Sequence, residues 1–201
     1  MKAELLAPAG SLESFYAAIN SGADSVYLGG KLFSARNYAR NFDEEEMKHI
    51  VKYAHNKGVK VYVTMNTILK DIEITDALNY AAFLYANDVD ALIVQDLGFL
   101  HLINKYLPDF PVNISTQAVA YDEYGVKFFE DLRVKKVIMA RELSLEELRE
   151  AAKNTKTDLE VFIHGALCTC YSGQCYMSSF LGGRSGNRGK CAQPCRLSYT
   201  F

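Results

Sequence analysis

The repeating unit of this chain is written out in residues 43–64, DEEEMKHIVKYAHNKGVKVYVT. Asp43 is a residue type that caps helices, and the three glutamates after it favour the positive end of a helix dipole. Gly58 stands where such a helix should stop. The run over residues 60–64 is short and rich in β-branched residues, which is typical of a buried strand. The stretch therefore predicts a helix followed by a strand.

The same alternation extends along the 201 residues. Strands are predicted over residues 4–6, 25–28, 60–64, 91–94, 112–114, 136–139 and 160–163, and helices over residues 11–21, 43–57, 74–87, 97–106, 124–132 and 144–153. Strands that alternate with helices require right-handed crossovers and a parallel sheet. The expected class is α/β, an incomplete (β/α)8 TIM-barrel-like fold with about seven units; the alternatives are a seven-stranded incomplete barrel and an open doubly wound sheet.

Composition excludes some classes of protein. The formal net charge is −2, so the chain as a whole is not a strongly basic nucleic-acid binder. No stretch reaches the roughly 18 apolar residues of a membrane span, and the first residues lack the apolar region of a signal peptide. We therefore expect a cytoplasmic protein.

All five cysteines fall close together near the end of the sequence, with the spacing C-x-C-x4-C-x15-C-x3-C. They are Cys168, Cys170, Cys175, Cys191 and Cys195. A cytosolic setting and an odd count both disfavour a disulfide framework. Several thiols in one short segment match a thiolate-bound metal centre, because each thiolate supplies one ligand. We expect a barrel-like domain over residues 1–166 and a cysteine segment over residues 167–201.

Polar residues directly after the predicted strands define a candidate rim. In barrels the chemistry gathers at the carboxyl ends of the strands. The residues in question are Asn66, Gln95, Gln117, Arg141, Glu142 and His164. Amides, a guanidinium and an imidazole on one rim suit a polar or carboxylate-bearing ligand. Asn66, Gln95 and Gln117 are therefore predicted to bind substrate, although each could instead cap a strand or helix.

Three stretches carry a family resemblance. They are EVFIHGALC at 160–168 with GQCYMS at 173–178, GNRGKCAQPCR at 186–196, and LLAPAG at 5–10. Together they resemble the collagenase-like peptidase family U32 along the length of the chain. The resemblance implies a barrel-like amino-terminal domain of a longer protein. It also implies relatives that hydroxylate tRNA, rRNA or ubiquinone precursors without oxygen, and a prephenate hydroxyl source in the RNA-modifying members.

The resemblance also implies a [4Fe-4S] cluster held by four cysteines. Cys168, Cys175 and Cys191 match its ligands, and Cys195 is the candidate for the fourth. Cys170, or a residue beyond the end of this sequence, is the rival for that place. Four thiolates also suit tetrahedral zinc, so the spacing alone leaves iron–sulfur and zinc both open.

The predicted catalytic residues are His164, Arg141 and Glu142. Arg141 could hold a carboxylate through its planar guanidinium, and His164 could move a proton near neutral pH. The alternative is that Arg141 and Glu142 form an ion pair and that His164 has only a structural role. The sequence contains neither H-E-x-x-H nor G-x-S-x-G. RNA hydroxylation is therefore the leading expectation, with peptide hydrolysis and a zinc-tied binding scaffold as alternatives.

One segment offers a positive surface for RNA. Residues 182–190 combine glycines with Arg184, Arg188 and Lys190. Aromatic residues that could stack an unpaired base lie nearby at Tyr171, Tyr176 and Phe180. The alternative is a flexible, solvated loop. A second basic stretch, residues 31–40, could contribute to the rim. The expected partners are RNA and a small carboxylate donor.

Overall fold

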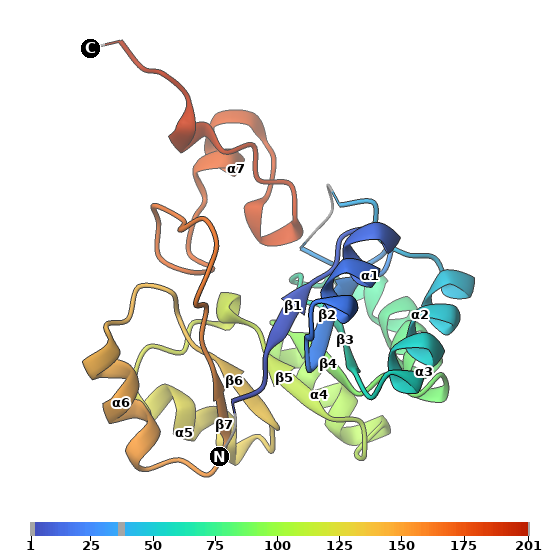
Figure 1. Cartoon of the computed structure of the whole chain (residues 1–201). Coiled ribbons are helices and arrows are strands. Elements are labelled where there is room, and N and C mark those ends of the chain that lie inside the picture. Colours follow the sequence, from blue (N-terminus) through green and yellow to red (C-terminus); the bar gives the residue numbers. More distant parts are fainter. Residues whose placement is uncertain (1–2, 36–38, 201) are drawn as a thin grey trace. The chain divides into compact units, whose positions relative to one another are not determined.

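The chain is described by a computed structural model that covers residues 3–35 and 39–200. It divides into two compact units, Met1–Pro111 and Val112–Phe201. Each unit is built of parallel strands that alternate with helices (Figure 1). Among the described residues, no helix is both long and apolar enough to cross a membrane.

The first unit contains β1 to β4 and α1 to α4. The strands are β1 (Leu6–Pro8), β2 (Ser25–Gly29), β3 (Lys60–Met65) and β4 (Ala91–Val94), and each pairs in parallel with the next. The helices are α1 (Leu12–Asn20), α2 (Glu44–Asn56), α3 (Ile74–Ala86) and α4 (Leu97–Tyr106), with a short 3-10 turn, η1 (Asp71–Glu73), before α3. In Figure 1, α2 and α3 lie along one side of these strands.

The helix starts of this unit follow from their capping residues. The Ser11 hydroxyl accepts from the Ser14 backbone N–H at 3.2 Å, and Asp43 Oδ1 accepts from the Glu46 N–H at 3.0 Å. Hydrogen bonding from the Glu46 backbone, with a further contribution from Lys31, lowers the pKa of Asp43. Each cap satisfies an amide that would otherwise lack a partner in the first helical turn. These contacts confirm the predicted starts of α1 and α2.

Among the described residues, the largest fully buried side chains all belong to the first unit. They are Phe15, Leu28, Phe42, Met47, Ile50, Tyr62, Met65, Leu84, Leu92, Phe99, Leu100 and Ile103. Burying a side chain of this size contributes about 1.5–3 kcal/mol relative to leaving it in water. The first unit therefore contains the main hydrophobic core.

The second unit contains β5 to β7. These strands are β5 (Val112–Ile114), β6 (Lys136–Ile138) and β7 (Asp158–Glu160), again parallel and paired in chain order. A 3-10 turn, η2 (Thr116–Ala118), precedes α5 (Glu123–Asp131), and α6 (Leu145–Lys153) links β6 to β7. The cysteine segment adds α7 (Met177–Gly182) and the 3-10 turns η3 (Gly186–Arg188) and η4 (Pro194–Arg196). Its side chains are mostly exposed, so this unit has the smaller core.

The described residues contain seven parallel strands, which confirms the α/β class and the incomplete (β/α)8-like order. All seven predicted strands and all six predicted helices are present. Two strands differ from their predicted ranges by more than one residue. The first was predicted over residues 4–6 and is Leu6–Pro8, because its pairing with β2 begins at Leu6 and Ser25. The seventh was predicted over residues 160–163 and is Asp158–Glu160. Its partner β6 ends at Ile138, which is in register with Glu160. Residues 161–163 therefore have no continuation of β6 to pair with, and they are exposed.

Candidate functional site

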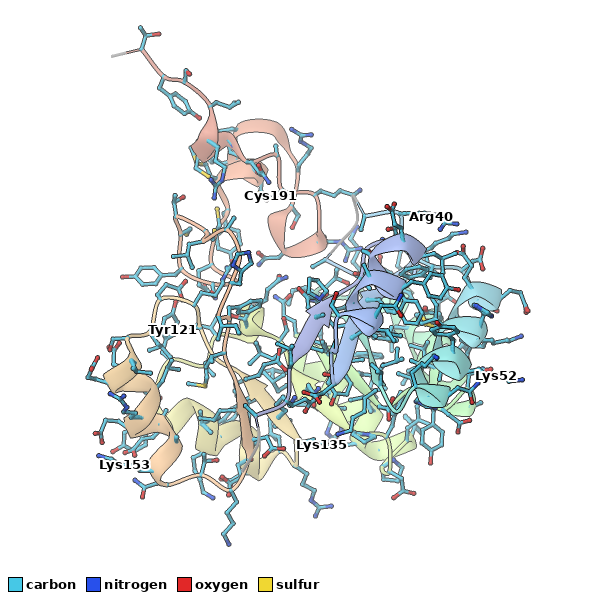
Figure 2. The ribbon with its side chains drawn as sticks, viewed as in Figure 1. Arg40, Lys52, Tyr121, Lys135, Lys153 and Cys191 are labelled. Atoms are coloured by element: carbon cyan, nitrogen blue, oxygen red, sulfur yellow. The ribbon has the colours of Figure 1, made fainter. Side chains whose placement is uncertain are left out.

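The cysteine segment follows β7, and all five of its cysteines are free thiols. Cys170 and Cys175 flank a tight turn formed by residues 171–174, here called the cysteine turn. It is closed by a hydrogen bond from the Gln174 N–H to the Tyr171 carbonyl at 3.1 Å. Gly173 provides the positive φ of 73° that this turn requires. Figure 2 labels Cys191, which lies later in the same segment.

Cys170 has thiol neighbours on both sides. Burial raises its pKa, and the nearby Cys175, which is in hydrogen-bond contact with it, raises the pKa further; Cys168 adds a smaller effect of the same sign. A thiolate at Cys170 would be poorly solvated and close to other sulfur atoms, which explains the direction of the shift.

Cys191 has its own donors. The Gln193 N–H donates to Cys191 Sγ at 3.4 Å, and the buried Ser178 hydroxyl donates to the same sulfur at 3.8 Å. Gly186 lies between this residue and Cys175, because a Cβ added at Gly186 would be 3.7 Å from the Cys175 carbonyl oxygen and 3.8 Å from Cys191 Cβ. The backbone near Cys191 thus packs close to that of Cys175.

Cys195 lies in η4 and is exposed. The next residue, Arg196, donates from Nη2 to the carbonyl oxygen of Leu167 at 2.8 Å. Leu167 directly precedes Cys168. This contact links the two ends of the cysteine segment, so the loops that carry Cys168 and Cys195 are held together.

The donor set fits a soft metal or an iron–sulfur cluster in its chemistry, because thiolates are the ligands that both prefer. In residues 3–35 and 39–200, however, no three or more His, Cys, Asp or Glu side chains are grouped to hold a metal ion. The loops are neighbours, but their thiols do not converge on one point. Metal binding therefore stays a prediction, as does the choice of Cys195 or Cys170 as fourth ligand.

Arg141 and Glu142, which follow β6, contact the cysteine turn. Arg141 Nε donates to Ser172 Oγ at 3.1 Å, and its backbone N–H makes a longer contact with the same oxygen at 3.5 Å. Glu142 Oε1 accepts from the Ser172 backbone N–H. Ser172 is completely buried. The two predicted catalytic residues therefore meet at one serine, whereas the sequence analysis had considered an ion pair between them.

Tyr121 is a second neighbour of the turn that the sequence analysis did not identify. Its ring meets that of Tyr171 edge-on, with centroids 6.0 Å apart. Burial raises the pKa of Tyr121, and the carboxylate of Glu142 raises it further. In the described part of the chain, its buried hydroxyl makes no hydrogen bond of normal length and angle. Tyr121, which is labelled in Figure 2, lies in the connection between η2 and α5.

The remaining predicted residues are distributed over both units. In the first unit, Asn66 Oδ1 accepts from the Ala35 N–H at 3.0 Å, and Gln95 is buried with an Oε1 that lacks a partner among the described residues. In the second unit, the backbone of Gln117 in η2 packs against Gly173. His164 is exposed. The structure does not test their roles.

The two arginines predicted to bind RNA lie after α7. Arg184 is exposed, and its backbone is tied to α7 through the carbonyl of Ser178 and the hydroxyl of Ser179. Arg188 ends η3 and is half-buried. Of the second basic stretch, Arg40 pairs with Glu46 at 2.6 Å, and Arg36 lies outside the described residues.

Comparison with known proteins adds relatives over nearly the whole chain. The 23S rRNA 5-hydroxycytidine synthase of Escherichia coli is 44% identical over 198 residues, which is 98% of this chain and 30% of the relative. The tRNA hydroxylation protein P of the same organism is 36% identical over 199 residues, 98% of this chain and 44% of the relative. The chain thus spans less than half the length of either protein.

A solved structure shows the same fold. The U32 peptidase Mk0906 superposes with a TM-score of 0.67 at 17% identity, over 80% of this chain and 68% of that one. The model of peptidase family U32 matches residues 10–201. These residues include all five cysteines, both rim residues that contact the cysteine turn and both arginines after α7. This chain belongs to peptidase family U32.

Proposed function

We propose that the chain is part of an RNA-hydroxylating protein that acts on tRNA or rRNA without molecular oxygen. The observation that carries this proposal is the relationship to two proteins named for RNA hydroxylation, at 44% and 36% identity over 98% of the chain. Their shared region includes the cysteine segment. A function common to both relatives is therefore the best-supported function for this chain.

Cys168, Cys175, Cys191 and Cys195 are the proposed ligands of a [4Fe-4S] cluster. Two contacts support this set: Gly186 lies between Cys175 and Cys191, and Arg196, next to Cys195, donates to the carbonyl of Leu167, next to Cys168. A bound cluster would supply one-electron chemistry to the reaction. Zinc remains the alternative for the same thiolates and would imply a binding role without redox chemistry.

The proposed hydroxyl donor is a small carboxylate such as prephenate. Arg141 uses Nε for Ser172, and its two terminal nitrogens have no partner in the described part of the chain. Two parallel N–H groups can donate hydrogen bonds to the two oxygens of one carboxylate. The exposed imidazole of His164 could accept or return a proton near neutral pH. Glu142 holds the Ser172 amide beside this position, and the carboxylate would bind next to the cysteine turn.

RNA is proposed to bind along the surface after α7. Arg184 and Arg188 would contact phosphates, and Tyr176 and Phe180 would stack bases, since their side chains are 63% and 89% exposed. Replacing both arginines with alanine should weaken binding of single-stranded RNA and reduce its salt dependence by about one unit of slope per lost phosphate contact. Lys156→Ala removes an exposed charge elsewhere in the same unit and is the matched control.

The decisive experiment uses the full-length protein, prepared anaerobically. Iron and acid-labile sulfide are measured first, and RNA from cells with and without the gene is then compared by mass spectrometry. We expect one nucleoside to lose the mass of one oxygen atom in the deletion strain. Complementation with Cys168→Ser should fail. Complementation with Thr200→Ser, a change at an exposed residue, should succeed. RNA of unchanged mass would refute the proposal.

Peptide hydrolysis is the second candidate, and the name of the family favours it. It predicts cleavage of gelatin or casein by protein that contains no metal. That activity should survive Cys191→Ser and be lost in His164→Ala. Zinc at one ion per chain, with neither iron nor hydrolysis, would instead favour a binding scaffold.

A further inference from the structure

We propose that Ser172 is a positioning residue that couples the Arg141 guanidinium to the cysteine turn, so that a carboxylate bound at Arg141 and the closed turn stabilise each other. The inference rests on the carboxylate site proposed above for Arg141, and it names the residue that connects this site to the cysteine segment. It depends neither on which metal the cysteines bind nor on the RNA.

The loops that follow β5 and β6 form a joined seat for the turn. The Thr116 hydroxyl donates to the Met139 carbonyl oxygen at 3.1 Å, and the Ala140 N–H donates to the Ala120 carbonyl oxygen at 3.0 Å. Each bond connects a residue after β5 with a residue after β6. The two loops are therefore tied to each other, and a segment that packs on both is held on two sides.

The cysteine turn contacts both loops through adjacent residues. A Cβ at Gly173 would be 2.1 Å from the Gln117 carbonyl oxygen, so the Gly173 backbone lies directly on the loop after β5. The completely buried Ser172 contacts the loop after β6: its hydroxyl accepts from Arg141 Nε at 3.1 Å, and its N–H donates to Glu142 Oε1. Hydrogen bonds that involve a charged side chain are stronger than neutral ones. Ser172 is thus the point where the turn and the guanidinium meet.

The Ser172 hydroxyl limits the freedom of the Arg141 side chain. An arginine side chain has many rotamers, and a hydrogen bond at Nε restricts the orientation of the planar guanidinium. The two terminal nitrogens are then already oriented for a carboxylate. Binding therefore loses less conformational entropy than it would at an arginine without this bond.

The effect must also act in the opposite direction. If the Ser172–Arg141 bond favours carboxylate binding, linkage requires that a bound carboxylate favours this bond by the same factor. The bond holds the turn on its seat, so a bound carboxylate should slow the opening of residues 171–174. Cys175, a proposed metal ligand, directly follows these residues. Occupancy at Arg141 would therefore order the backbone next to a proposed ligand.

The test uses the full-length protein, freed of metal with a chelator, and prephenate as the probe. Calorimetry measures prephenate binding, and hydrogen exchange followed by mass spectrometry reports the opening of residues 170–175. In the wild type, saturating prephenate should slow this exchange about tenfold, whereas potassium chloride at equal ionic strength should not. Ser172→Ala removes the hydroxyl and keeps the amide that donates to Glu142. It should weaken prephenate binding about tenfold and abolish the slowing.

Two further variants separate coupling from general damage. Ser179→Ala removes a hydroxyl that donates to the Arg184 carbonyl in the same segment, and it should behave as the wild type. Arg141→Lys keeps the charge without the Nε donor, so it should also lose the slowing, and it keeps the test open if the Ser172 variant does not fold.

The outcomes distinguish this inference from the proposed function. Slowing that persists in the Ser172 or the Arg141 variant, or equal prephenate binding by the wild type and Ser172→Ala, would overturn the coupling and leave the carboxylate site standing. A wild type that does not bind prephenate would overturn both. RNA hydroxylation is judged separately, by the masses of the nucleosides.

Discussion

Gly173→Ala gives the sharpest test of how the cysteine turn is held. Alanine at φ 73° adopts a left-handed backbone that costs about 1–2 kcal/mol. Its methyl group would also lie 2.1 Å from the Gln117 carbonyl oxygen, well inside the 3.0 Å below which Cβ atoms are essentially never found. The obstacle is backbone, so no side-chain rotation relieves it. The turn must therefore lift away from Gln117.

Lifting the turn would break the two contacts of Ser172. Each is a hydrogen bond to a charged group and contributes about 1.5–3 kcal/mol. Together with the backbone strain, we expect the closed turn to lose at least about 3 kcal/mol, which corresponds to a hundredfold or greater rise in opening. Hydrogen exchange at the Ser172 amide reports this opening directly, because that amide donates to Glu142.

Gly183→Ala is the matched control. Gly183 has a similar positive φ of 64°, but a Cβ there would meet nothing within 4 Å. It should therefore show only the backbone penalty of about 1–2 kcal/mol and leave exchange at Ser172 unchanged. If the two alanine variants exchange the Ser172 amide at the same rate, the packing of Gly173 on Gln117 does not hold the turn, and the reasoning is wrong.

Three further predictions concern other parts of the chain. Hydrogen bonds from Lys127 and from two neighbouring residues lower the pKa of Glu130 from 4.5 to about 2. Because the folded-state pKa is lowered, the Glu130 carboxylate stabilises the fold above pH 4.5, and this stabilisation is lost as the pH falls towards 2. The difference in Tm between the wild type and Glu130→Gln should therefore shrink over that range. Asp96 caps α4 at 2.9 Å and also accepts from a loop amide at 3.0 Å. Asp96→Ala should therefore cost about 2 kcal/mol in urea denaturation and exceed Asp122→Ala, which removes one cap bond. Tyr121→Phe removes a buried hydroxyl without a full hydrogen bond and should leave the free energy of unfolding unchanged or raise it by up to about 1 kcal/mol.

Local chemistry explains why most elements could be predicted. Helix starts at Ser11, Asp43 and Ser144 depend on contacts within three residues, and all three side chains accept from a backbone amide as expected. The seventh strand was misplaced because strand pairing depends on a distant partner. Residues 161–163 have strand composition, but β6 ends too early to pair with them. Helix α7 was missed because its N-cap, Tyr176, provides no side-chain hydrogen bond.

The same distinction between local and distant contacts applies to the candidate site. Position on a rim follows from strand order, so Arg141 and Glu142 could be named from the sequence. Their partner could not be named, because Ser172 lies about 30 residues later in a loop without repeating pattern. The one available signal was Gly173, whose place between two cysteines is compatible with a tight turn. Tyr121 has no comparable signal in the sequence.

The uneven distribution of buried side chains gives these loop contacts their importance. The largest fully buried residues lie in the first unit, whereas the cysteine segment exposes Leu167, Tyr171 and Phe180 at 65%, 65% and 89%. A segment that buries so little apolar surface cannot be ordered by the hydrophobic effect alone. Its conformation must depend on specific polar contacts such as those of Ser172, or on a bound ligand that adds its own free energy. Breaking the contacts at Ser172 should therefore loosen the cysteines while leaving the core of the first unit intact.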